Sequence, residues 1–199
     1  MRIFPVILGL SLASVAAAAP TPAQLDQTIA ATFSQASPEW KARIAQDETQ
    51  RLCSERRNNP TPAEATAIEA REKQTIAYPV SGQFMGDWKR GAAIAQNGQG
   101  GQFSDAPGTI SGGNCYACHQ MDPKEISFGT IGPGLVGYGQ LRDFKPEATR
   151  DAFAKVFNAQ AALACSTMPR FGHNKVLTEQ QIQDVTAYLM SPDSPVNKP

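Results

Sequence analysis

Two cysteines and a histidine near the middle of the chain form its most informative chemical pattern. Cys115, Cys118 and His119 follow one another in the order Cys-x-x-Cys-His, which is the attachment signature of a c-type haem. Cysteines at this spacing lie on one side of a helical turn, so both thiols can form thioethers with the two vinyl groups of one haem. His119 can then turn its imidazole toward the iron. The motif predicts one covalently bound haem c.

Two other uses of paired cysteines fit the sequence less well. A structural zinc site needs four ligands, and the chain has neither a second Cys-x-x-Cys pair nor a His-x-x-His pair. A thioredoxin-like redox pair follows a strand in a βαβ unit, and no such pattern is visible. Haem attachment is therefore the prediction for this motif.

A methionine is the expected second axial ligand of the iron. Met168 is the best candidate, because it precedes a proline in a loop between two expected helices. Met121 is only two residues beyond His119 and cannot easily reach round the ring. Met190 suits the end of a helix, and Met85 precedes the haem motif, where such ligands seldom lie. Filling of the core is the alternative role for any of these methionines.

The N-terminus has the composition of a secretory signal. Arg2 supplies a positive charge, residues 3–12 are largely apolar, and small residues occupy 14–19, in the order typical of a cleaved signal peptide. The apolar run is shorter than the roughly 20 residues of a membrane-spanning helix, and no later stretch is long and apolar enough. We expect a signal peptide over residues 1–18 and a periplasmic protein with no membrane span.

Two cysteines remain outside the haem motif. Cys53 and Cys165 form an even remainder, which in an exported protein points to a disulfide between them. A free thiol that carries sulfur is the alternative. Cys165 and His173 could also coordinate haem iron, although a disulfide and an exposed position at the haem edge are simpler explanations.

The overall charge gives no reason to expect nucleic acid or an anionic membrane as a partner. The chain has 18 Lys and Arg residues and 18 Asp and Glu residues. Such a balance carries no strong field of either sign. The length is sufficient for one haem domain with an extension.

The elements that must position these residues are all predicted to be helical. Prolines directly after Ser37 and Thr61 indicate two helix starts. A helical period continues over residues 146–162, and Thr178 begins the clearest helix as part of a capping box. No alternating strand pattern of useful length is present. The expected fold class is all-α with long loops.

The helix expected at Asp87–Gln96 contains a glycine on its apolar face. Gly91 lies beside the face formed by Trp88, Ala92 and Ala95. Glycine costs a helix about 1 kcal/mol relative to alanine. A close crossing with another helix would compensate for this cost.

The chain is predicted to consist of a helical extension over residues 19–78 and a haem domain over residues 79–199. Trp40, Ile44 and Leu52 give one expected helix of the extension a thin apolar stripe. The apolar content is low for independent folding. The extension is therefore expected to pack on the rest of the protein or on a partner.

The order of the motifs resembles the class I cytochromes c. After the haem motif come Gly-Pro-Gly-Leu at residues 132–135 and then Met168 with its proline. Helices are expected on either side, at residues 87–96 and 178–190. The resemblance implies a class I cytochrome c-like haem domain.

The same resemblance implies roles for individual residues. In that family the loop proline offers its carbonyl to the proximal histidine, so Pro133 would orient His119, and Leu135 would pack on the ring. Met168 would be the second axial ligand. His/Met ligation raises the reduction potential and leaves no open position at the iron, which favours electron transfer over catalysis.

The loop sequences, taken more widely, resemble those of the SoxX cytochromes, the small haem subunits of SoxAX complexes. The match covers about residues 82–197 and includes Asn114–Gln120, Gly129–Pro133, Met168–Gly172 and Ser191–Asn197. The resemblance implies a heterodimer with a SoxA-like haem subunit, which joins thiosulfate to a carrier-protein cysteine and removes two electrons. The chain would be the electron-transfer subunit of this L-cysteine S-thiosulfotransferase, without a catalytic centre of its own, and would pass electrons to another cytochrome.

Two further hypotheses about function also fit the haem motif. A stand-alone soluble periplasmic carrier would use identical haem chemistry and differ only in its surface and partner. A ligand-sensing haem would need a labile or absent sixth ligand, so carbon monoxide binding to the reduced protein would favour it.

Overall fold

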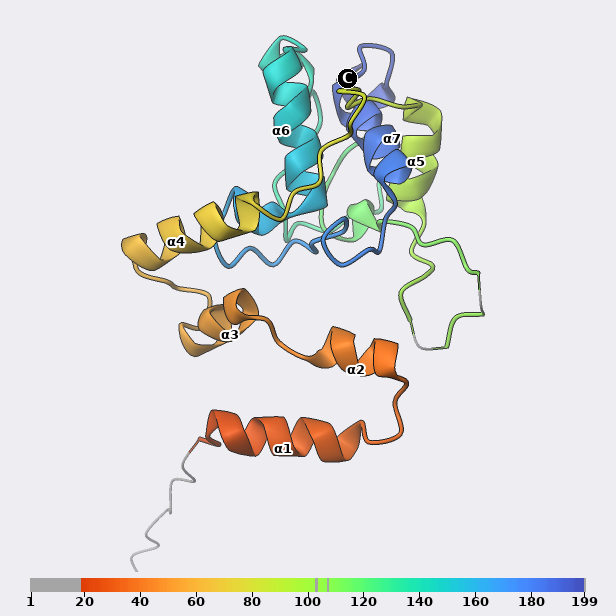
Figure 1. Cartoon of the computed structure of the whole chain (residues 1–199). Coiled ribbons are helices and arrows are strands. Elements are labelled where there is room, and N and C mark those ends of the chain that lie inside the picture. Colours follow the sequence, from red (N-terminus) through yellow and green to blue (C-terminus); the bar gives the residue numbers. More distant parts are fainter. Residues whose placement is uncertain (1–18, 103, 107, 199) are drawn as a thin grey trace, which may run out of the picture. The chain divides into compact units, whose positions relative to one another are not determined.

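Helices are the only regular elements in the part of the chain that the structure describes, residues 19–102, 104–106 and 108–198 (Figure 1). The structure is a computed structural model. It confirms the all-α fold class. The signal peptide predicted over residues 1–18 lies outside the described residues. The described residues divide into two compact units, one that ends at Ile44 and one that starts at Ala45.

The first unit contains two short helices in its described part, α1 (Pro22–Thr32) and α2 (Pro38–Ile44). Thr21 begins α1 with a capping box. Its hydroxyl accepts a hydrogen bond from the Gln24 amide, and the Gln24 side chain accepts one from the Thr21 amide. Neither helix has a fully buried side chain.

The apolar stripe predicted for one helix is divided between two. Trp40 and Ile44 lie in α2, whereas Leu52 lies in α3 (Glu48–Glu55). Asp47 causes the break, because its carboxylate accepts a hydrogen bond from the Gln50 amide at 2.8 Å and starts a new helix. A single helix over this stretch was therefore the wrong prediction.

Part of the predicted extension belongs to the same unit as the haem motif. Both α3 and α4 (Pro62–Lys73) lie in the unit that starts at Ala45, and α4 packs against the 3₁₀ turn η3 (Ala159–Ala161). The expectation that the extension packs on the rest of the protein therefore holds for α4. A domain boundary at residue 78 stays a prediction.

Three helices form the centre of this unit: α5 (Trp88–Gln96), α6 (Pro146–Phe157) and α7 (Glu179–Met190). Figure 1 shows α5 beside α7, and α6 also packs on α7. A Cβ atom on Gly91 would lie 2.0 Å from the backbone oxygen of Asp184. The glycine thus permits the close crossing of α5 and α7.

The chain after α6 turns earlier than the sequence predicted. The helix expected to reach Ala162 ends at Phe157, and Asn158 leaves the helical conformation with φ −151° and ψ 96°. The Asn158 side chain accepts the Gln160 amide at 3.1 Å and donates to Glu72 of α4 at 2.7 Å. A contact with the extension therefore fixes the end of α6.

Three apolar clusters lie among the described residues of this unit, and α7 contributes to two of them, called the first and second clusters here. Tyr188 and Leu189 belong to the first cluster, while Ile182 and Val185 belong to the second. The remaining short turns are η1 (Cys115–Ala117), η2 (Gln140–Arg142) and η4 (Pro195–Asn197). Because α7 contributes residues to both the first and the second cluster, it connects the segments that pack on them.

Candidate haem site

The Cys-x-x-Cys-His motif lies on the tight turn η1. The Cys115 carbonyl accepts hydrogen bonds from the amides of Cys118 at 3.1 Å and His119 at 2.9 Å. Asn114, just before the turn, has a left-handed backbone with φ 46°. Cys115 and Cys118 form no disulfide, and each is partly buried. The turn therefore holds both thiols and the imidazole within one short segment.

No set of zinc ligands surrounds this motif. Across the described residues, no three His, Cys, Asp or Glu side chains gather in a way that could hold a metal ion. A structural zinc site would need a set of four ligands.

The loop after the motif orients the His119 ring. Nδ1 of His119 lies 2.7 Å from the carbonyl oxygen of Pro133. A carbonyl only accepts, so Nδ1 carries the hydrogen and donates it, which leaves the Nε2 lone pair free for a metal. The Gly132 amide donates to the Cys118 carbonyl at 2.9 Å, and the Leu135 amide donates to Gln120 at 2.7 Å.

Gly132 lies directly against the imidazole. A Cβ atom at this position would lie 2.2 Å from Cε1 of His119 and 2.5 Å from Nδ1. Only glycine leaves room for the ring in this orientation. The donor set and the space around it fit a haem-ligating histidine.

The motif is also connected to the helical core. The hydroxyls of Tyr116 and Tyr188 are 2.7 Å apart, and Tyr116 accepts the Asp122 amide at 3.1 Å. Leu135 is partly buried against the first apolar cluster, which contains Tyr116 and Tyr138. The loop that orients His119 thus packs on the same cluster as the motif.

Met168 is partly buried against the second apolar cluster, and its amide donates to the Ser166 hydroxyl at 3.2 Å. Met121 and Met190 are each 1 % exposed and belong to the first cluster, whereas Met85 is 42 % exposed. Two of the rival methionines therefore serve the core.

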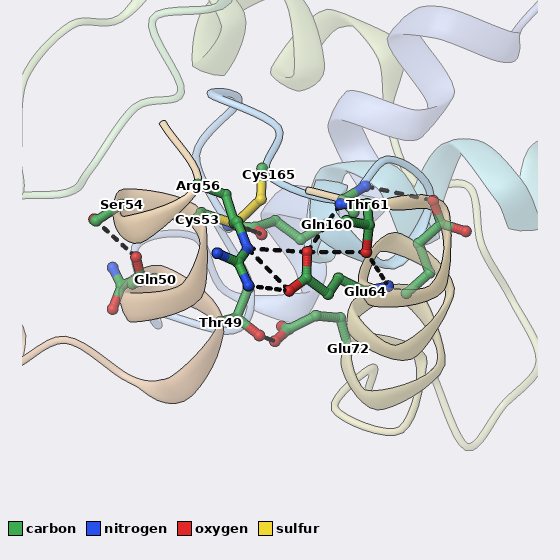
Figure 2. Close-up of a disulfide and its surroundings, with 12 residues drawn as sticks. Thr49, Gln50, Cys53, Ser54, Arg56, Thr61, Glu64, Glu72, Gln160 and Cys165 are labelled. Carbon is green, nitrogen blue, oxygen red and sulfur yellow. Dashed lines mark hydrogen bonds and ion pairs between the residues drawn. A yellow bond between two sulfur atoms is a disulfide. The ribbon is translucent and has the colours of Figure 1, made fainter. Parts of the chain in front are cut away.

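A disulfide joins Cys53 of α3 to Cys165, in the segment before Met168 (Figure 2). Neither cysteine is a free thiol in the structure. His173, expected to be exposed, is partly buried, and its Nε2 lies 4.0 Å from the Asp47 carboxylate.

A buried ionic cluster near Met168 was not predicted. Arg170 pairs with Glu72 at 3.2 Å and with Asp47 at 2.5 Å. Arg170 and Glu72 are 98 positions apart, and no local pattern connects them. The sequence offered one sign of this cluster, the charged residue Arg170 directly after Met168 and its proline.

A comparison with protein families decides the class of this site. The family model described as cytochrome c matches residues 89–192, just over half of the chain. The chain belongs to the cytochrome c family. Cytochromes c bind their haem covalently, so this cytochrome carries haem c and acts as an electron carrier.

A similar protein comes from the bacterium Aquifex aeolicus (strain VF5). It is described as an uncharacterized lipoprotein and is 38 % identical to this cytochrome over 166 residues, which is 79 % of this chain and 76 % of the relative. A lipoprotein relative and a cytochrome c domain fit a protein outside the cytoplasm. Within the described part of the cytochrome, no helix combines the length and the apolar character needed to cross a membrane.

Proposed function

We propose that this cytochrome binds one haem c through thioethers at Cys115 and Cys118, with His119 and Met168 as axial ligands. The hydrogen bond of 2.7 Å between His119 Nδ1 and the Pro133 carbonyl carries this proposal, because it leaves Nε2 available for iron. The bound haem supplies a one-electron Fe(III)/Fe(II) couple.

Each protein group has a distinct task in this proposal. Pro133 holds His119 in one tautomer and one orientation, as partners of ligating histidines do in other metal sites. Leu135 packs between the loop and the first apolar cluster, so it helps to keep water from the ring. Met168 fills the second axial position, which leaves no open position for a substrate. These tasks are those of an electron-transfer site.

We further propose that the cytochrome is the electron-transfer subunit of a SoxAX-like complex in the periplasm. It would accept electrons from thiosulfate oxidation on a SoxA-like haem subunit and pass them to another cytochrome. Support comes from the resemblance of the loop sequences at Asn114–Gln120, Met168–Gly172 and Ser191–Asn197 to those of SoxX cytochromes. Helices α3 and α4 also add surface that a minimal carrier would not need.

Two measurements test these proposals separately. Haem staining of the denatured protein should be positive for the wild type and lost in a Cys115→Ala/Cys118→Ala variant, because only thioethers survive denaturation. Purification from cells grown on thiosulfate should recover a second haem subunit with this chain. Recovery of this chain alone would count against the complex and favour a stand-alone carrier.

A further inference from the structure

The segment that carries Met168 is held on both sides by the helices before the haem motif. Cys165, three residues before Met168, is bonded to Cys53 of α3. Arg170, two residues after Met168, is paired with Glu72 of α4 and with Asp47, the cap of α3. Figure 2 shows the disulfide and Glu72 of α4 in the same region.

The Arg170–Glu72 pair is buried, and both oxygens of the Glu72 carboxylate accept hydrogen bonds. The two side chains are 5 % and 4 % exposed. Glu72 also accepts hydrogen bonds from the Thr49 hydroxyl and, at 2.7 Å, from Asn158. Thr49 in turn accepts from Arg71 at 3.1 Å. Each oxygen of the Glu72 carboxylate therefore has partners of fixed direction.

Such a pair is poor evidence for a role in stability alone. Taking two charges out of water offsets most of their attraction, and apolar side chains of similar size often stabilise a protein at least as well. The pair does fix the position of Arg170, because charge-assisted hydrogen bonds are directional. It therefore holds the backbone at Arg170 in one place.

After Arg170 the loop is anchored to other elements, whereas the Met168 amide bonds within the loop, to the Ser166 hydroxyl at 3.2 Å. Phe171 is buried in the second cluster, and the amides of Gly172 and His173 donate to the Phe157 carbonyl at 3.0 and 3.2 Å. Met168 lies outside any helix. Its position therefore depends on the fixed points at Cys165 and Arg170.

We propose that Arg170 is a positioning residue, whose buried ion pair with Glu72 acts with the Cys53–Cys165 disulfide to hold Met168 on the haem iron. This inference rests on the proposed role of Met168 as a ligand. Fixing both sides of a short loop removes most conformations in which the thioether leaves the iron. Helices α3 and α4 would thereby control how easily another ligand replaces Met168 on the iron.

The test measures how readily imidazole, a small ligand, displaces Met168 from the sixth coordination position of ferric iron. Glu72→Gln removes the buried charge of the two that pair with Arg170, leaves the Asp47 carboxylate in place, and keeps a side chain of similar shape. We expect it to weaken the red absorption band that reports methionine sulfur on ferric haem, and to tighten imidazole binding at least about fivefold, the lower end of typical coupling between sites. A Met168→Ala variant gives the limit of an open position.

Glu64→Gln is the matched control. Glu64 also lies in α4 and pairs with a residue of the preceding segment, Arg56, at 2.6 Å (Figure 2). That pair includes no residue of the Met168 loop. The control should bind imidazole as the wild type does.

A second variant covers the case in which Glu72→Gln does not fold, since it leaves Arg170 without its buried partner. The double variant Glu72→Gln/Arg170→Gln has neither charge and should fold while showing the same tighter imidazole binding. Wild-type imidazole affinity and an intact methionine band in the folded variants would overturn the positioning role. If the wild type lacks the band, or Met168→Ala keeps it, the ligand assignment itself fails.

Discussion

His119 takes its orientation from Pro133, fourteen positions further along the chain, rather than from its own turn. A carbonyl that accepts from Nδ1 makes Nε2 a better donor to a metal, and loss of such partners typically weakens metal sites by about 10–100-fold. The geometry depends equally on the absence of a side chain at Gly132. Residues that act on His119 can therefore control the site.

Gly132→Ala should displace the imidazole. The added methyl group would lie 2.2 Å from Cε1 of His119, so the ring must turn away and give up the Pro133 carbonyl. We expect a lower yield of low-spin haem in the absorption spectrum. Gly134→Ala is the control, because a Cβ atom there meets nothing within 4 Å; equal spectra for both variants would contradict the prediction.

Met168→Ala should leave the haem attached and lower its reduction potential markedly. The thioethers do not depend on Met168, whereas axial ligation is a main control of haem potentials, which span about 0.8 V. A redox titration beside Met85→Ala, which alters an exposed methionine, measures the effect. An unchanged potential in Met168→Ala would remove Met168 from the ligand set.

At the scale of the helices, the accuracy of the sequence predictions depended on the range of the interactions. The start of α7 was predictable, because Thr178 and Gln181 form a capping box within one turn. The end of α6 was not, because Asn158 binds Glu72, which is 86 positions away. In the site, likewise, the local His-Pro arrangement followed from a resemblance, whereas the Arg170–Glu72 pair had no local signal.

Gly91→Ala should lower stability although alanine is the better helix former. The added Cβ would lie 2.0 Å from the Asp184 backbone oxygen, so α5 and α7 must separate, at a typical cost of about 1–3 kcal/mol. This exceeds the gain of about 1 kcal/mol in helix propensity.

Thermal unfolding measures the balance between these two effects. Ala93→Gly, on the exposed side of α5, calibrates the propensity effect alone. A higher melting temperature for Gly91→Ala would show that the helices do not meet as closely as described.

At the scale of the whole molecule, buried carboxylates connect segments far apart in the chain. Asp184 of α7 accepts the Asp87 amide and pairs with Arg90 at 2.8 Å each, and Glu72 links α4 to Arg170. Burial by itself would raise the pKa of both carboxyls. Their hydrogen bonds and the neighbouring guanidinium groups outweigh it, so each pKa lies below its ordinary value of 3.8 for Asp184 and 4.5 for Glu72.

The cytochrome should therefore lose stability in acid. A carboxyl with a lowered pKa in the folded state stabilises the protein fully above its ordinary pKa and loses this effect as the pH falls through the folded value. We expect these two carboxyls to contribute a steady free energy of unfolding above about pH 5 and a decreasing one below 4.5 and 3.8, their ordinary values.

Urea unfolding at a series of pH values measures this dependence. Asp184→Asn should make the dependence shallower, because it removes one of the titrating groups. Equal unfolding free energies at neutral and strongly acidic pH would contradict the prediction.

The pairing of Cys53 with Cys165 has a consequence for how the protein matures. The four cysteines of this chain must end in two different chemical states, one pair oxidised and one pair reduced for haem attachment. Disulfide exchange requires a thiolate, and burial raises the pKa of the Cys115 thiol to about 12. Before haem is attached, the buried Cys115 thiol of the folded chain is thus a slow nucleophile toward the Cys53–Cys165 disulfide.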